Sequence, residues 1–147
     1  MTAKIYPYLT FENAKEAMDY YVREFGAEIT YHQSLNEQQA ESLGMPTDRE
    51  HLEKTTLRGE FTIAGQKFIC ADATMGTPQT SSLVSIMLSF TDDPSQARQL
   101  FNQLAQSEDQ RVTVPFGDWM FGSQMGQVVD KYGITWLITT DYDLPEQ

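Results

Sequence analysis

The sequence repeats one pattern about 79 residues apart, and this repeat constrains the fold more than any single residue does. In each copy a strand-like run, Leu9–Phe11 or Leu88–Phe90, leads into a segment with apolar residues at helical spacing. Those apolar residues are Ala17, Tyr20 and Tyr21 in the first copy and Ala97, Leu100 and Phe101 in the second. A repeat at a fixed period predicts two copies of one supersecondary unit.

The first copy predicts a strand, a helix and three further strands. The strand Ile5–Phe11 contains Pro7, which lacks a ladder donor, so we expect an edge strand or a Pro7 nitrogen that faces away from its neighbour. Asn13 is the expected cap of the helix, and Gly26 is the expected left-handed residue after it. Further strands are predicted at 27–35, 52–64 and 67–71, with a polar loop at 36–49 that contains at most one helical turn.

The second copy predicts the same order of elements. Its first strand covers Leu83–Phe90, and Asp93 followed by Pro94 marks the start of its helix. Further strands are predicted at 111–115, 123–130 and 134–140, with a linker at 75–82 between the copies. We therefore predict one α+β domain, residues 1–147, built from two βαβββ modules at residues 4–74 and 83–143.

Charge and composition argue against several classes of partner. The net charge is −11 and the Lys and Arg residues are scattered singly, so repulsion from phosphates argues against nucleic acid and against an anionic membrane surface. No apolar run approaches the roughly 18 residues of a membrane helix, and the N-terminus has no signal-peptide core. Cys70 is the single cysteine and lies in an apolar run, which predicts a buried thiol and a cytoplasmic protein.

Two longer segments resemble a known family. In the first, Pro7–Phe11 leads into the helix and then Phe25-Gly26-Ala27-Glu28-Ile29. In the second, Pro115-Phe116-Gly117-Asp118-Trp119 is followed by the run Gly126–Trp136, which is the more specific match. Together they resemble the PhnB-like branch of the vicinal oxygen chelate superfamily, which is also called the 3-demethylubiquinone-9 3-methyltransferase domain. That superfamily includes glyoxalase I, bleomycin-resistance proteins and extradiol dioxygenases.

The resemblance implies a fold of two βαβββ modules that form a U-shaped cleft, commonly completed in a homodimer. In the metal enzymes of the superfamily, four ligands on the first and last strands of the modules hold a divalent ion. Carried onto this sequence, the positions are Tyr6, Arg58, Ser85 and Leu137, the Arg58 position being found by stepping back 79 residues from Leu137. A register shifted by two residues would place Glu60 there instead of Arg58.

These residues are a poor set for a metal. Leucine has no donor atom, arginine stays cationic, and a neutral tyrosine and a serine are weak ligands beside imidazole or carboxylate. The two histidines, His32 and His51, fall outside the matching positions and are interpreted as surface residues. We therefore predict no metal and no other cofactor.

The function predicted from these observations is binding of a small organic ligand without a metal. The expected cleft residues are Tyr6, Tyr8, Arg58, Glu60, Ser85, Trp119 and Leu137. Arg58 is the expected anchor for an anionic group, unless Glu60 neutralises it on a wet sheet face. The apolar run from Trp119 to Phe121 is expected to line the cleft or to contact a second copy of the chain. The alternative is a metal-dependent lyase or isomerase of the vicinal oxygen chelate type.

Overall fold

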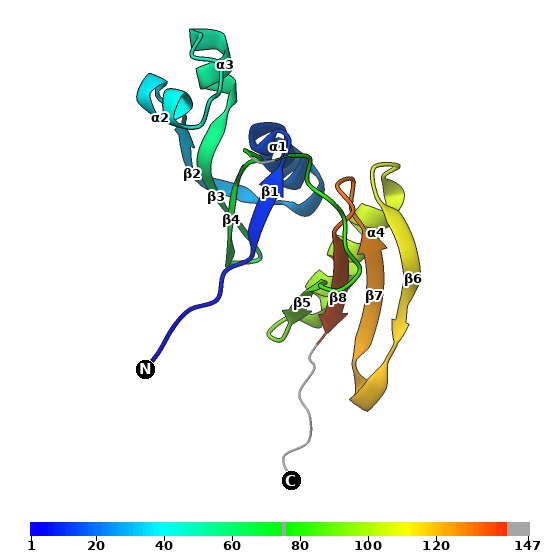
Figure 1. The fold of residues 1–147 in the computed structure, drawn as a ribbon. Coiled ribbons are helices and arrows are strands. Elements are labelled where there is room, and N and C mark those ends of the chain that lie inside the picture. The colour runs from blue at the N-terminus through cyan, green and yellow to red at the C-terminus, as the bar shows by residue number, and fades with distance from the viewer. Residues whose placement is uncertain (75, 141–147) are drawn as a thin grey trace. The chain divides into compact units, whose positions relative to one another are not determined.

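The structure is a computed structural model that describes residues 1–74 and 76–140. The chain divides into two compact units, Met1–Pro78 and Gln79–Gln147, and the boundary falls inside the predicted linker (Figure 1). Each unit is described by itself. The part of the predicted second module at 141–143 lies outside the described residues. Within the described ranges, no helix is both long enough and apolar enough to cross a membrane.

The first unit contains a four-stranded sheet, one long helix and two short ones. Its sheet has the order β1-β4-β3-β2, in which β1 and β4 are parallel and the other pairs antiparallel. Strand β1 lies at an edge, as Pro7 predicted, and its regular part begins only after that proline. The elements are β1 (Tyr8–Phe11), α1 (Ala14–Phe25), β2 (Glu28–Ser34), α2 (Glu37–Ser42), α3 (Arg49–Lys54), β3 (Thr56–Ile63) and β4 (Gln66–Asp72).

The second unit has the same topology. Its sheet has the order β5-β8-β7-β6, with β5 and β8 parallel and the other pairs antiparallel. The predicted α+β class and the βαβββ repeat are therefore confirmed. The elements are β5 (Ile86–Phe90), α4 (Pro94–Gln106), β6 (Arg111–Asp118), the 3₁₀ turn η1 (Met120–Gly122), β7 (Gln124–Val129) and β8 (Thr135–Thr140). The predicted start of the first of these strands at Leu83 is wrong by three residues.

The helix caps are those that the sequence predicts. Asn13 accepts a hydrogen bond from the backbone nitrogen of Glu16 at 3.1 Å, and Gly26 ends α1 with φ of 70°. Asp93 caps α4, which begins at Pro94, by accepting from the backbone nitrogen of Ser95 at 3.1 Å. These caps fix where each helix starts relative to the strand before it.

The predicted loop at 36–49 is wrong, because it contains most of two short helices. Helix α2 starts with a reciprocal capping box, in which Asn36 Oδ1 accepts from the Gln39 nitrogen at 2.7 Å and Gln39 Oε1 accepts from the Asn36 nitrogen at 2.9 Å. Both helices lie at one end of β2 and β3 (Figure 1). The predicted strand start at Leu52 is also wrong, since β3 begins at Thr56.

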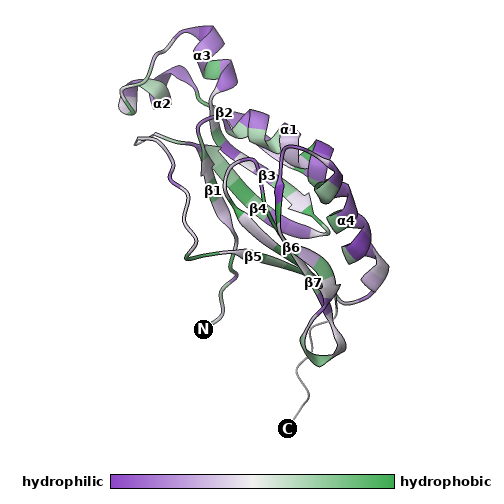
Figure 2. Ribbon diagram, turned by 90° about the vertical axis from the view of Figure 1, so that its right-hand side faces the viewer, coloured by the Kyte–Doolittle hydropathy of each residue, from purple (hydrophilic) through white to green (hydrophobic). Residues whose placement is uncertain are grey.

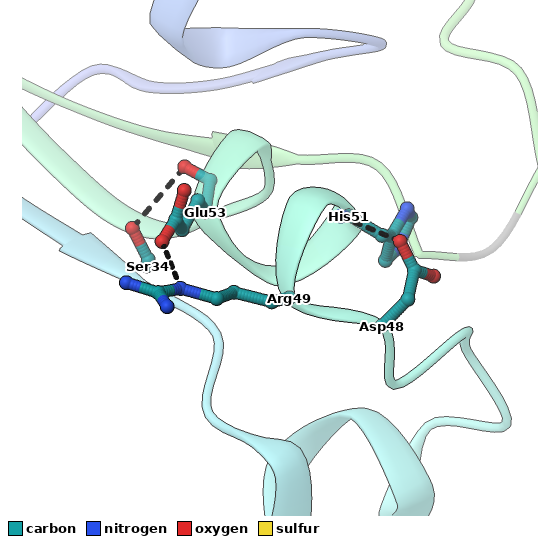
Figure 3. A network of polar contacts seen from close by, with 5 residues as sticks. All are labelled: Ser34, Asp48, Arg49, His51 and Glu53. Atoms are coloured by element: carbon teal, nitrogen blue, oxygen red, sulfur yellow. Dashed lines mark hydrogen bonds and ion pairs between the residues drawn. The ribbon is translucent and has the colours of Figure 1, made fainter.

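Helix α3 is held by charges that the strand prediction overlooked. Asp48 Oδ2 accepts from the backbone nitrogen of His51 at 2.9 Å, and Arg49 Nε donates to Glu53 Oε1 at 2.8 Å (Figure 3). The Ser34 hydroxyl on β2 contacts the Glu53 carbonyl at 3.5 Å. A capping aspartate followed by charges four residues apart is a helix signal, and it outweighed the strand-like reading of this segment.

The two modules align with different offsets at their first and last strands. Tyr8 lies opposite Ile69, and Met87 lies opposite Leu137. Met87 follows Tyr8 by 79 residues, whereas Leu137 follows Ile69 by only 68, because the first module contains the extra α2–α3 segment. The last-strand equivalent of Leu137 is therefore Ile69 on β4, and the step back of 79 residues to Arg58 on β3 is wrong.

The core of the first unit lies between α1 and its sheet. The Phe61 ring stacks on Tyr21 at 5.4 Å and on Phe68 at 5.2 Å, between ring centroids. A Cβ atom on Gly59 would lie 2.8 Å from the sulfur of Met18, so this glycine lets α1 approach β3 closely. The predicted alternation along the third strand is confirmed, with Phe61 and Ile63 buried and Arg58 exposed.

The core of the second unit repeats this packing. Hydrophilic residues predominate in the α4 ribbon (Figure 2), while Ala97, Phe101 and Leu104 are its buried residues. A Cβ atom on Gly126 would lie 2.5 Å from the Phe101 ring. Gly126 pairs with Ile138 as Gly59 pairs with Cys70, so the two modules share a glycine at one sheet position under the helix.

Candidate functional site

The candidate site is the face of the first sheet that points away from α1. Gly59 lies against Met18 of α1, and a Cβ on it would also lie 2.9 Å from the sulfur of Cys70, so both positions face the helix. Because strand residues alternate between faces, Arg58 and Glu60 on β3 and Ile69 on β4 point to the opposite, helix-free face. Tyr8, Ile69, Glu60 and Tyr31 form one row across all four strands.

A charged cluster occupies the middle of this face. Glu60 Oε1 lies 2.5 Å from Lys67 Nζ, while its Oε2 lies 3.6 Å from Arg58 Nε. The ammonium of Lys67 also lies 5.5 Å from the centroid of the Tyr6 ring, a cation–π contact. The hydrogen bond from Lys67 is the main reason that the pKa of Glu60 lies below its usual value, and the charge of Arg58 acts in the same direction. Glu60 is therefore a carboxylate at neutral pH.

Lys67 is the site residue that sequence reasoning missed. It is brought to this face by the β3–β4 hairpin, whose two turn residues Ala64 and Gly65 have φ of 50° and 78°. With both central residues at positive φ the turn is of the I′ class, and it places Gln66 opposite Ile63 and Lys67 opposite Thr62. The predicted turn at Gly65-Gln66 was one residue too late. A two-residue hairpin read correctly would have placed Lys67 diagonal to Glu60.

The predicted competition for Arg58 is resolved in favour of Lys67. The 2.5 Å contact is a close charge-assisted pair, whereas 3.6 Å exceeds the 2.7–2.9 Å of a strong one. The Arg58 side chain keeps 46% of its surface exposed, and that of Glu60 only 14%. Two cations thus share one carboxylate, and the cluster has an excess of one positive charge.

Tyrosine side chains flank the cluster on this face. Tyr8, the first residue of β1, is 60% exposed, and Tyr6 precedes that strand. Tyr31 on β2 lies opposite Glu60, and its hydroxyl donates to Gln33 Oε1 at 3.0 Å. The structure therefore brings Tyr6, Tyr8, Arg58 and Glu60 of the predicted set to one sheet face, and adds Lys67 and Tyr31.

The predicted site residues of the second module are uncharged and less closely grouped. Leu137 is half-buried on β8 and pairs with Met87 and Gln127. Ser85 is exposed and lies just before β5 rather than within it. Trp119 follows β6, and its backbone nitrogen donates to the Ser123 carbonyl at 2.8 Å. The position equivalent to Glu60 is Gln127, so the charged cluster is a property of the first module.

The residues at the metal-ligand positions do not fit a divalent ion. With the corrected register, the first-strand positions hold Tyr6 and Ser85, and the last-strand positions hold Ile69 and Leu137. Two of the four have no donor atom, and the remaining hydroxyls are weak ligands. Across residues 1–74 and 76–140, no three His, Cys, Asp or Glu side chains are grouped so that they could hold a metal.

The two histidines lie away from this face, beside consecutive buried threonines. His32 Nε2 lies 2.9 Å from Thr56 Oγ1, and His51 Nε2 lies 3.3 Å from Thr55 Oγ1. Both are half-buried, so their interpretation as plain surface residues is only partly right. Burial raises the pKa of nearby Asp72, whose Oδ1 accepts from the Ala14 nitrogen at 2.8 Å. These contacts tie α3, β2 and β4 together and are structural.

Cys70 has no role as a nucleophile. It is fully buried against α1, and burial raises the pKa of its thiol to about 12. Because the thiolate is the reactive form, the side chain behaves at neutral pH as a small apolar residue, as the sequence predicted.

Comparison with known proteins places the chain in a family. The model described as 3-demethylubiquinone-9 3-methyltransferase matches residues 3–139. The chain belongs to this family. Protein YjdN of Escherichia coli (strain K12), a relative of the chain, is 25% identical over 146 residues, which cover 96% of this chain and 97% of YjdN. The 3-demethylubiquinone-9 3-methyltransferase family name comes with no methyltransferase-type site among the residues described above.

Solved structures confirm the fold class of this family member. The PhnB protein of Bacillus cereus has a TM-score of 0.67 and 27% identity, and the match covers 94% of this chain and 99% of PhnB. The glyoxalase/bleomycin resistance protein/dioxygenase of Alicyclobacillus acidocaldarius has a TM-score of 0.62 at 12% identity, over 96% of this chain and 92% of that protein. The chain is thus a PhnB-like protein with the glyoxalase/bleomycin-resistance fold of the vicinal oxygen chelate superfamily.

Proposed function

We propose that this protein binds a small organic anion on the helix-free face of its first sheet, without a divalent metal. The observation that carries the proposal is the excess positive charge of the Arg58–Glu60–Lys67 cluster in a chain of net charge −11. A local cation on an acidic protein costs nothing in non-specific attraction to polyanions, and it gives a small anion one preferred docking point.

The side chains around the cluster suit a ligand with an anionic group and an aromatic or apolar body. The guanidinium of Arg58 offers planar paired donors that match a carboxylate. Tyr6 and Tyr8 offer exposed ring surface beside it, and Ile69 supplies apolar surface between them and β3. Ser85, Trp119 and Leu137 are proposed as uncharged contacts from the second module.

Arg58→Ala is expected to abolish the thermal stabilisation given by small aromatic acids. A thermal-shift screen of benzoate, salicylate, phenylacetate and phenyl phosphate checks this, with Arg49→Ala as the matched control. Arg49 carries the same charge on α3 and its side chain is 91% exposed. We expect at least a roughly tenfold loss of affinity in Arg58→Ala, about 1.4 kcal/mol, and no loss in Arg49→Ala. If both variants keep every hit, Arg58 is not the anchor.

Purified protein is expected to contain no stoichiometric divalent metal. The donor set is the reason, since leucine and isoleucine stand at two of the four positions that hold the ion in the superfamily's metal enzymes. Elemental analysis after chelator-free purification measures this, with a zinc protein prepared in parallel as the positive control. One equivalent of Mn, Fe, Ni or Zn per chain would favour the alternative, a metal-dependent lyase or isomerase.

The protein is also proposed to form a homodimer. Trp119, Met120 and Phe121 are consecutive and 45%, 48% and 61% exposed, a concentration of apolar surface that favours burial against another copy. Light scattering at tens of micromolar is expected to give twice the chain mass of 16.7 kDa, and Met120→Glu to lower that value. A mass of one chain for the unaltered protein would refute the dimer.

The proposed location is the cytoplasm. The chain's only cysteine is buried and reduced, which fits a compartment without disulfide formation. Fractionation of cells that express the protein at native level checks this.

A further inference from the structure

We propose that Lys67 controls the anion site through Glu60. By holding the Glu60 carboxylate, Lys67 leaves the Arg58 guanidinium open to a ligand, and the shared carboxylate makes the site selective for monoanions over dianions. This inference rests on the proposed function, since it concerns the same sheet face, and it assigns a role to a residue that does not itself need to touch the ligand.

The geometry of the Glu60 carboxylate carries the first step. Its two oxygens face two different cations, Oε1 towards Lys67 Nζ at 2.5 Å and Oε2 towards Arg58 Nε at 3.6 Å. The closer partner holds the carboxylate, so the Arg58 contact is the weaker of the two. Without Lys67, the only cation in contact with Glu60 in the described structure would be Arg58, and a side chain 14% exposed has strong reason to close on it.

The position of Lys67 is fixed by elements that do not depend on a ligand. The type I′ turn at Ala64 and Gly65 sets it opposite Thr62, and the Tyr6 ring lies 5.5 Å from its ammonium. Lys67 is therefore pre-set beside Glu60, as a positioning residue must be.

The charge of the cluster carries the second step. Arg58 and Lys67 contribute two positive charges and Glu60 one negative charge, so one ligand charge neutralises the cluster and a second would face the carboxylate. Glu28 lies across Thr62 from Lys67 on the same face, but it is exposed and its charge is screened by water. A carboxylate fits this site better than a phosphate dianion.

A double-mutant cycle on full-length protein tests the first step, with benzoate as the probe in calorimetric titration at pH 8. Lys67→Met is expected to weaken benzoate binding at least roughly tenfold in the unaltered background, but less than about twofold when Glu60→Gln is already present. Lys67→Arg should bind normally. An equal loss in both backgrounds would mean that Lys67 acts directly on the ligand or through net charge, and would overturn the inference. No loss in either would do the same.

The second step is tested with phenyl phosphate, which is a dianion at pH 8 because its second pKa is about 6. Glu60→Gln is expected to raise the affinity for phenyl phosphate relative to benzoate by roughly fivefold or more, about 1 kcal/mol. Glu28→Gln removes the same charge from the same face and should change the ratio by less than about twofold. Equal changes in the two variants would contradict the selectivity.

Failure of this inference is distinguishable from failure of the proposed function. If Arg58→Ala binds benzoate as tightly as the unaltered protein, the proposed function fails. If Arg58→Ala loses benzoate while Lys67→Met costs the same in both backgrounds, only the role of Lys67 fails. The Glu60 pKa from carbon NMR gives an independent readout, since Lys67→Met should raise the lowered value of the unaltered protein.

Discussion

Asp130→Ala is expected to lower the free energy of unfolding by about 3 kcal/mol. The Asp130 side chain is buried, and its Oδ1 accepts from the backbone nitrogens of Tyr132 and Ile134 at 2.8 and 3.0 Å. Its Oδ2 accepts from Trp136 Nε1 at 2.8 Å, and Trp136 is fully buried. Alanine would leave these donors in the core without that acceptor, at a cost of roughly 1–3 kcal/mol for each buried group.

Urea unfolding measures this cost, with Asp118→Ala as the control. Asp118 is an exposed carboxylate of the same module, 3.5 Å from Gln124 Nε2, and its removal should change stability by less than about 0.5 kcal/mol. Asp130→Asn should also destabilise, because the amide nitrogen would face Trp136 Nε1, and adding Trp136→Phe should reverse part of that loss. Equal effects at Asp118 and Asp130 would contradict the structural role.

Gly126→Ala is expected to cost about 2–3 kcal/mol through overpacking. The new Cβ would lie 2.5 Å from the Phe101 ring, which is buried under α4. Gly59→Ala, at the equivalent position of the first module, should cost less, because the atoms it meets at 2.8 Å are the flexible end of Met18. Thus two glycines at equivalent positions should respond unequally.

Gly117→Ala is the matched control for Gly126, since no atom lies within 4 Å of its added Cβ and β6 is a strand of the same sheet. We expect a change of less than about 0.5 kcal/mol in chemical unfolding. Stabilities of Gly126→Ala and Gly117→Ala that agree within error would show that α4 does not pack on β7 as closely as described.

The fold was predictable because its signals are local. The caps at Asn13 and Asp93, the proline before β1 and the helical spacing of apolar residues each act within a few positions of the chain. The repeat joined them into one topology. The alternation of Phe61 and Ile63 with Arg58 likewise needed only the period of a strand.

The site was predictable only in part, because it depends on register. A constant 79-residue step failed once the α2–α3 segment lengthened the first module, and it replaced Ile69 by Arg58 in the comparison with Leu137. Lys67 was missed for the same reason, since its contact with Glu60 follows from the exact residues of one turn. A shift of one residue in a hairpin moves a side chain to the other face.

The most direct test of the proposed metal-free anion site is a calorimetric titration of benzoate into protein treated with EDTA, repeated after addition of one equivalent of Mn²⁺. We predict the same affinity in both titrations, in the millimolar range of about −4 kcal/mol, and a loss of at least roughly tenfold in Arg58→Ala under both conditions. Benzoate binding that requires Mn²⁺, or that is unchanged by Arg58→Ala, would contradict the account.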